Sequence, residues 1–290
     1  MDPYVKEIVC STWNAAPGAF HTLGRLCRNR GIKLTVYMDK AGAKRFSDVT
    51  EEARNAADHL TILNSHAKFL AFRGGRIPAI ALFTGNLLRR KRLEAVHLST
   101  FPQDIESVID QFTGACKRCL DDIDPLSNGE LIVTDGDLDF ADVVLWASRL
   151  LGPSRLLLST WASHPKQIEK LADQEWLDVR YATHASAQRI AKPGFEAARF
   201  WLKAQGYQAP RPWLSHLKLA ALESPAGQIG IWSSANLQHN PRKEHYLITS
   251  HPLYIDFWKT KHRLLFERAP NGGFPGGERR AMAALRRSNP

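Results

Sequence analysis

Long hydrophobic runs and an export signal are both missing from this sequence. No run of apolar residues approaches the ~18 that a membrane-spanning helix needs. The first residues, MDPYVKEIVCSTW, lack a basic segment followed by an apolar core, which a signal peptide would have. We therefore predict no membrane span and a cytoplasmic location.

Cysteine is scarce, with four residues: Cys10, Cys27, Cys116 and Cys119. Without an export signal, reduced thiols are expected in place of disulfides. Cys116 and Cys119 form a CxxC pair, but no second Cys or His pair follows at the spacing of a zinc finger. The pair is interpreted as a helix end in preference to a zinc or redox site, so no metal and no cofactor are predicted.

Acidic residues are outnumbered by basic ones. The 290 residues include 39 Lys and Arg against 29 Asp and Glu, a net charge of +10. Such a balance favours a polyanionic partner, either nucleic acid or an anionic membrane surface. The hydrophobic content of 44% is ordinary for a globular protein. The length allows one large domain or two of about 140 residues.

One stretch of the sequence occurs twice. The first motif runs from Ser65 to Glu94, and the second motif, 150 residues later, runs from Ser215 to Glu244. Nine identities fall within 38 aligned positions, whereas chance predicts about two. The identical pairs are Ser65/Ser215, His66/His216, Lys68/Lys218, Ala71/Ala221, Asn86/Asn236, Leu87/Leu237, Arg92/Arg242, Glu94/Glu244 and Pro102/Pro252. Because mostly polar residues are kept while core positions vary, the duplication indicates chemistry.

The rest of the chain alternates between strand and helix patterns. Strands are predicted at 7–13, 33–38, 60–63, 77–84, 94–100, 131–134, 155–161 and 246–249. Helices are predicted at 17–30, 50–59, 102–119, 140–151, 165–173, 193–205 and 252–266. This alternation predicts α/β layers with a mixed, largely parallel sheet in each half. The expected domains are 1–124 and 125–268, separated near an acidic linker at 120–128 and followed by a mobile basic tail at 269–290.

Within each motif, the spacing of His and Lys predicts a common direction. Residues two apart on a strand face the same side, so His66 and Lys68 are expected to project together. Gly74 and Gly75 mark a hairpin turn, and the returning strand would deliver Asn86 just past its end.

A His with a Lys two residues later and an Asn after the hairpin, taken twice, resembles the phospholipase D superfamily. The resemblance covers both halves and implies two similar α/β halves with one active site between them. It implies that one His forms a phosphohistidine, that the other protonates the leaving oxygen, and that Lys and Asn hold the non-bridging oxygens. It also implies that a downstream carboxylate supports the His of the other half, and Glu94 and Glu244, each eight residues after its Asn, are the candidates. The family's Asp, five residues after the Lys, is replaced here by Arg73 and Glu223.

General chemistry supports these roles. Two Lys and two Asn residues would supply fixed charge and donors for a phosphodiester transition state. Two His residues can divide nucleophile and acid roles near neutral pH. A carboxylate on the distal ring nitrogen would fix the tautomer.

Further residues are candidates for substrate binding. A basic run after the first motif suits phosphate contacts, and Trp13 and Trp161, at the ends of matched strands, could stack on bases. The full set is Trp13, Trp161, Ser65, Ser215, Thr84, Ser234, Arg89, Arg90, Arg92 and Arg242.

The sequence predicts a metal-independent phosphodiesterase that cleaves nucleic acid, DNA in preference to RNA. By analogy His66 is the nucleophile and His216 the general acid, although the sequence does not order them. A phospholipase or phosphatidyl transferase and a catalytically silent nucleic-acid-binding protein stay open as alternatives. One chain carries both motifs, so a monomer suffices, and a homodimer is also compatible.

Overall fold

The structure, a computed structural model, describes residues 4–84, 86, 96–124, 129–213, 215–239 and 241–268. The chain forms two compact units. Unit 1 comprises Met1–Arg118, Leu131–Asp137 and Pro241–His245. Unit 2 comprises Cys119–Glu130, Leu138–Asn240 and Tyr246–Pro290. Each unit therefore contains segments that are distant in sequence.

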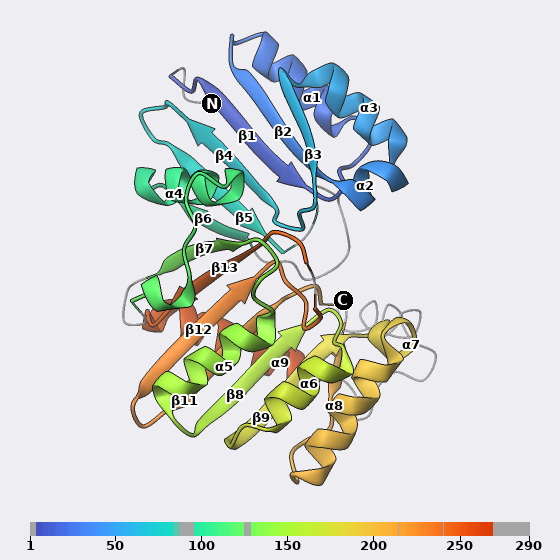
Figure 1. Cartoon of the computed structure of the whole chain (residues 1–290), viewed down its shortest axis with the longest axis vertical. Coiled ribbons are helices and arrows are strands. Elements are labelled where there is room, and N and C mark those ends of the chain that lie inside the picture. The colour runs from blue at the N-terminus through green and yellow to red at the C-terminus, as the bar shows by residue number, and fades with distance from the viewer. Residues whose placement is uncertain are drawn as a thin grey trace. The chain divides into compact units, whose positions relative to one another are not determined.

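The sheet of unit 1 has six strands in the order β3-β2-β1-β4-β5-β6 (Figure 1). Strands β1 to β3 pair in parallel, whereas β1–β4, β4–β5 and β5–β6 are antiparallel. The parallel part thus precedes the first motif, and the antiparallel part is built by its hairpin. The bounds of β1 to β6 are Glu7–Thr12, Lys33–Asp39, His59–Leu63, Phe69–Arg73, Ala79–Phe83 and Val96–Ser99.

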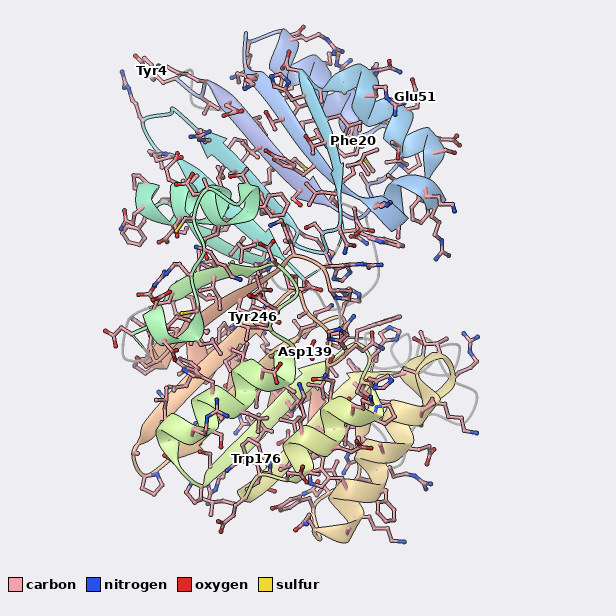
Figure 2. The ribbon with its side chains drawn as sticks, in the orientation of Figure 1. Tyr4, Phe20, Glu51, Asp139, Trp176 and Tyr246 are labelled. Carbon is pink, nitrogen blue, oxygen red and sulfur yellow. The ribbon has the colours of Figure 1, made fainter. Side chains whose placement is uncertain are left out.

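Helices α1 (Ala19–Arg28) and α3 (Ser47–Ala56) pack together against this sheet. Phe20 and Cys27 are buried at helical spacing in this core, and Figure 2 labels Phe20 there. The remaining helices of unit 1 are α2 (Lys40–Arg45) and α4 (Pro102–Thr113).

The second sheet has seven strands in the order β10-β9-β8-β11-β12-β13-β7. Strands β8 to β10 pair in parallel, and β8–β11, β11–β12 and β12–β13 are antiparallel, which repeats the pattern of the first sheet. The bounds of β7 to β13 are Glu130–Thr134, Ser154–Thr160, Trp176–His184, Arg211–Trp213, Leu219–Ser224, Gly227–Ser233 and Glu244–Thr249.

Helices cover both faces of this sheet. Figure 1 shows α5, α6 and α8 in front of it and α9 behind it. On the α9 side, a Cβ at Gly230 would lie 2.6 Å from the Trp258 ring, so the glycine permits close packing. The helices are α5 (Phe140–Leu151), α6 (Pro165–Ala172), α7 (Ala187–Ile190), α8 (Lys192–Ala204) and α9 (Pro252–Arg268), and a short 3-10 turn spans Leu120–Asp122.

The predicted α/β class with two mixed sheets flanked by helices is confirmed. The expectation of largely parallel pairing holds only for β1–β3 and β8–β10, because the motif hairpins form the rest of each sheet. Strand β9 and helix α2 were missed. Helix α4 ends at Thr113 because Gly114 takes a left-handed conformation there, so it stops short of the CxxC pair.

Each predicted domain is one continuous stretch of the chain, whereas each of the two units combines several separate stretches. The domain assignment stays a prediction, and the tail at 269–290 lies outside the described residues. No helix in the described part of the chain is long and apolar enough to cross a membrane.

Candidate active-site motifs

The His and Lys of each motif lie immediately before a strand. Strand β4 begins at Phe69 and β11 at Leu219, so the pairs sit in the segments that lead into them. The Lys68 ammonium donates to the His66 carbonyl at 2.5 Å, and that of Lys218 to the His216 carbonyl at 3.0 Å. The two-residue spacing therefore folds each Lys back onto its own His.

Both motif lysines are buried. Lys68 is 1% exposed and Lys218 is 0% exposed. Burying an ammonium group costs free energy unless hydrogen-bond acceptors surround it. A buried lysine in both copies of the motif therefore indicates a functional role for its charge. In unit 2 the ammonium also lies 3.0 Å from His216 Nδ1. Lys218 thus lies beside the imidazole of its own motif, whereas Lys68 contacts the backbone carbonyl of His66.

A carboxylate from the second motif contacts the imidazole of the first. Glu244 Oε1 lies 3.1 Å from His66 Nδ1, and the Glu244 side chain is only 2% exposed. A carboxylate accepts and does not donate when ionised, so Nδ1 carries the proton and Nε2 keeps its lone pair. The pair has the geometry predicted for a carboxylate that orients a catalytic His. It lies within unit 1, because Pro241–His245 belongs to that unit.

Backbone hydrogen bonds hold Glu244 in this position. The Lys243 carbonyl accepts from the N–H groups of His66 at 2.8 Å and Ala67 at 2.9 Å. The Lys243 N–H donates to the Asn64 carbonyl at 3.1 Å, and the Asn64 side chain donates to Pro241 O at 2.6 Å. A five-residue segment of the second motif is therefore joined to the first motif.

Side chains of the same segment add ionic contacts. Lys243 forms an ion pair with Asp135, and Arg242 Nε lies 3.8 Å from the buried carboxylate of Asp39. Asp39 also accepts from the Ser65 N–H at 3.2 Å and caps α2. Arg242, a predicted substrate contact, thus has a protein partner, and its contact with substrate stays a prediction.

The hydroxyl groups around the motifs stabilise turns. Ser65 Oγ accepts from Ala67 N–H at 3.2 Å, and Ser215 Oγ accepts from Leu217 N–H at 3.1 Å. Both serines are 2% exposed. Their hydrogen bonds within the turn explain why both copies of the motif have a serine at this position. Thr84 and Ser234 are fully buried at 0%. Substrate binding by these four residues stays a prediction.

The two Ser-Thr-Trp triplets of the sequence also have matched structural tasks. Ser11 Oγ donates to the Ala67 carbonyl at 2.8 Å, and Ser159 Oγ donates to the Leu217 carbonyl at 3.5 Å. These carbonyls lie between the His and the Lys of each motif. Strands β1 and β8 therefore fix the motif backbone in the same way.

The two motif asparagines share an uncommon feature. Asn86 and Asn236 are half-buried, and the side-chain oxygen of each has no hydrogen-bond donor among the described residues. Buried polar atoms are nearly always paired, so a matched exception in both motifs is informative. It suits side chains that bind a ligand.

Trp161 lies beside the imidazole of the second motif. Its ring centroid is 6.0 Å from that of His216 and 6.0 Å from that of His184. Trp13 instead packs edge-on against Phe46 at 5.3 Å. The two tryptophans, predicted as equivalent, therefore have different surroundings.

His184 is a neighbour that sequence reasoning missed. It is 0% exposed, and its Nδ1 accepts from the Ser186 N–H at 3.1 Å. No residue of the first repeat matches it, so the sequence carried no signal for it. Its contact with Trp161 helps to set the position of that ring beside His216.

The positions that replace the family's Asp form ion pairs. Arg73 contacts Glu7 at 2.9 Å and Glu106 at 2.7 Å, and Glu223 contacts Lys259 at 2.9 Å. Arg73 and Glu223 thus form ion pairs with residues of neighbouring elements in their own units.

Another histidine near the first motif is buried in neutral form. The pKa of His245 is lowered to about 3, mainly by burial and also by the Lys68 charge, while Glu244 opposes the shift. His245 follows Glu244 directly in β13. At neutral pH, His245 therefore adds no charge beside Lys68.

Comparison with known proteins places this arrangement in a known fold. No family model and no curated protein matches the sequence. Polyphosphate kinase from Porphyromonas gingivalis matches 91% of the chain with a TM-score of 0.60 at 14% identity. The chain has a phospholipase D-like fold. It spans 46% of that kinase's length.

Two further solved structures resemble this chain less closely. Yeast tyrosyl-DNA phosphodiesterase matches 86% of the chain and 83% of its own length, with 9% identity and a TM-score of 0.47. The phospholipase D family member Nuc from Salmonella typhimurium matches 50% of the chain and 99% of its own length, with 12% identity and a TM-score of 0.38.

Several predicted site residues lie outside the described residues. They are Arg89, Arg90, Arg92 and Glu94. Their roles stay predictions. In the parts of the chain that the structure describes, no group of His, Cys, Asp and Glu is arranged to hold a metal ion.

Proposed function

We propose that this protein is a metal-independent phosphodiesterase that cleaves nucleic acid, DNA in preference to RNA, through a phosphohistidine intermediate. The observation that carries the proposal is the His66–Glu244 contact at 3.1 Å, next to the buried Lys68. It leaves Nε2 of His66 as an oriented nucleophile with a fixed positive charge nearby. The net charge of +10 supports a polyanionic substrate.

The reaction proceeds in two balanced steps. Nε2 of His66 attacks phosphorus, a P–N bond forms, and the P–O bond to the leaving strand breaks. His216 gives its proton to the leaving oxygen. Water then attacks the phosphohistidine, the P–N bond breaks, and His216 takes the proton from that water. Glu244 stabilises the charged imidazole of His66 throughout.

The other motif residues act on the phosphoryl oxygens. Lys68 and Lys218 offset the negative charge that grows on them, and Asn86 and Asn236 donate hydrogen bonds. Trp161 offers a face for a base near His216. The chain works as a cytoplasmic monomer or homodimer in this proposal.

The fold favours a second candidate, phosphoryl transfer on inorganic polyphosphate. The similarity to polyphosphate kinase covers 91% of this chain with a TM-score of 0.60. Polyphosphate is also a polyanion, so the charge suits it equally. The two candidates share the phosphohistidine and differ in the acceptor: water in one case and a nucleotide phosphate in the other.

One experiment tests the proposal and separates the candidates. Wild type, His66→Ala and His216→Ala are incubated in EDTA with labelled single- and double-stranded DNA and RNA, with polyphosphate plus nucleoside diphosphate, and with phospholipid vesicles. His21→Ala, at an exposed position on α1, is the matched control.

Cleavage of DNA that both motif variants abolish and the control retains supports the proposal. Turnover of polyphosphate alone would replace it with the kinase reaction, and turnover of vesicles alone with a phospholipase or phosphatidyl transferase. Salt-dependent DNA binding without turnover, unchanged in both motif variants, would identify a catalytically silent binding protein.

A further inference from the structure

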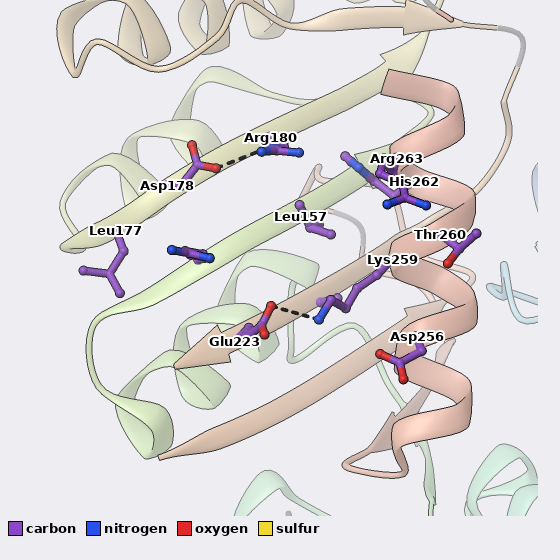
Figure 3. Close-up of a pocket in the computed structure, with 12 residues that line it drawn as sticks. Leu157, Leu177, Asp178, Arg180, Glu223, Asp256, Lys259, Thr260, His262 and Arg263 are labelled. Carbon is purple, nitrogen blue, oxygen red and sulfur yellow. Dashed lines mark hydrogen bonds and ion pairs between the residues drawn. The ribbon is translucent and has the colours of Figure 1, made fainter. Parts of the chain in front are cut away.

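Unit 2 contains a cavity under α9. It has a volume of about 640 Å³ and lies between α9 and the strands β8, β9 and β11 (Figure 3). Pockets that bind small ligands commonly enclose roughly 300–1,000 Å³. The cavity is therefore large enough for an organic molecule of nucleotide size.

Strand register places Arg155, in the cavity wall, away from the end of the sheet that carries His216 and Lys218. Arg155, near the start of β8, pairs in register with Asp178 on β9 and Glu223 on β11. Trp161 follows the end of β8, six residues further on, which corresponds to about 20 Å along a strand. A ligand in the cavity would therefore not touch His216.

The acidic side chains in this row already have other partners. Asp178 lies 3.3 Å from Arg180, and Glu223 lies 2.9 Å from Lys259, as Figure 3 shows. Arg155 lies between them in register, yet it makes no ion pair with any residue that the structure describes. Its guanidinium is left available to a ligand.

Arg263 brings a second guanidinium to the cavity from α9. Its nearest carboxylate among the described residues, that of Glu267, is 3.9 Å away and one helical turn on. A contact of this length between exposed side chains contributes little. Two arginines thus line one cavity without a strong ionic partner of their own.

The other walls suit the organic part of a ligand. Leu157 and Ala221 supply apolar surface on the sheet side, and Asp256 on α9 supplies a carboxylate. Asp256 forms no ion pair within the described ranges of the chain, so it can accept from a hydroxyl or amino group. His262 adds no charge at neutral pH, because burial lowers its pKa to about 4.

We propose that this cavity binds a small phosphorylated molecule of the nucleotide class. Arg155 and Arg263 hold its phosphate, since guanidinium groups bind phosphate oxygens in a bidentate manner. Asp256 accepts from its sugar or base. The site does not include the motif His, Lys or Asn residues and does not depend on the proposed phosphodiesterase activity.

Calorimetric titration tests this proposal. Wild type, Arg155→Gln and Arg263→Gln are titrated with 2′-deoxyadenosine 5′-monophosphate and with inorganic phosphate. Arg149→Gln, which removes the same charge from an exposed position on α5, is the matched control. We expect the nucleotide to bind at least about tenfold more weakly to each cavity variant and unchanged to the control.

Other outcomes would overturn the proposal. Nucleotide binding that is unchanged in both cavity variants would assign it to the motifs, which also attract phosphate. Inorganic phosphate binding as tightly as the nucleotide would overturn the ligand class. Thermal unfolding of the variants shows whether they fold, and Arg155→Lys, which keeps the charge without the planar fork, should bind with intermediate affinity.

Discussion

His66 takes its carboxylate partner from the other copy of the repeat. Glu244 is 178 residues away in the chain, yet its oxygen lies 3.1 Å from the ring nitrogen. Glu94, at the matching position in the first copy, shares the eight-residue distance from its Asn. The family resemblance implies that such a carboxylate supports the His of the other half, and the contact between Glu244 and His66 has this arrangement. Glu94 lies outside the described residues, so its role stays a prediction. Backbone pairing around Lys243 holds Glu244 in place.

Glu244→Gln removes the negative charge beside His66 while keeping the side-chain shape. We expect kcat to fall by at least about 100-fold, because the amide neither stabilises a charged imidazole nor enforces the reactive tautomer. The pH profile of kcat should shift as well, which a merely structural role would not cause. Glu51→Gln, in an exposed ion pair with Arg54, is the control and should retain activity within about twofold. Equal rates for wild type and Glu244→Gln would contradict the assignment.

Buried histidines predict how stability depends on pH. The folded pKa of His262 is about 4, below its usual value of 6.5, because of burial. Between these values the unfolded chain binds more protons, so the free energy of unfolding falls as pH drops from 6.5 toward 4. His245, with a folded pKa of about 3, adds to this dependence.

Urea unfolding of His262→Phe at pH 7.5 and pH 4.5 measures its share. We expect the free energy of unfolding to fall less on acidification than in wild type, since the variant has lost one titrating group. The variant also loses the bond from Nε2 to the Leu158 carbonyl, so only the difference between the two pH values is compared. His21→Ala, at an exposed position, should show the wild-type difference. An unchanged difference in His262→Phe would refute the prediction.

At the scale of single elements, α2 shows how tertiary contacts override weak local signals. Its sequence, KAGAKR, is short and contains a glycine, so it gave no helical prediction. Asp39 caps it through the N–H groups of Ala41 and Gly42, and Gly42 packs against the Trp13 carbonyl. The helix therefore forms because of a cap and a close contact.

Gly42→Ala tests that close contact. A Cβ at this position would lie 2.0 Å from the Trp13 carbonyl oxygen, so backbone must move. We expect a loss of about 1–3 kcal/mol in the free energy of unfolding, measured with urea. Lys44→Ala, at an exposed position in the same helix, should change it by less than about 0.5 kcal/mol. A Gly42→Ala protein as stable as wild type would show that α2 does not approach Trp13 this closely.

Strand β9 was missed for a related reason. Its sequence, WLDVRYATH, includes Asp178, Arg180 and His184, whose polar side chains obscured the apolar pattern. Asp178 and Arg180 pair with each other at 3.3 Å and line the cavity under α9. Polar residues on a strand face that α9 covers therefore made the strand hard to predict from the sequence. Two of them, Asp178 and Arg180, line the proposed binding cavity.

At the scale of the whole molecule, the net charge of +10 predicts salt-dependent catalysis. Added salt weakens contacts with the phosphates of a long polyanion, so KM for DNA should rise steeply with salt while kcat changes little. A small diester, bis(4-nitrophenyl) phosphate, carries one charge and should show a much weaker dependence. Steady-state rates between 50 and about 200 mM salt measure both. The same salt dependence of KM for both substrates would exclude protein contacts with DNA phosphates other than the reacting one.

The units of the molecule are interleaved in a way that the sequence did not reveal. A repeat of 150 residues suggested contiguous halves, whereas Pro241–His245 belongs with residues of the first half. Pro241–His245 lies with the first half because its hydrogen bonds run to Asn64, His66 and Ala67.

The sequence by itself determined the duplicated motif, the α/β class and most helices and strands. These depend on identity, periodicity and turn residues, all of which are local properties of the chain. The tertiary structure alone decided that both motif lysines are buried, that the Lys243 backbone pairs with the first motif, and that Arg155 faces a cavity without an ionic partner among the described residues. Those features depend on contacts between residues far apart in the sequence, which a local pattern does not encode.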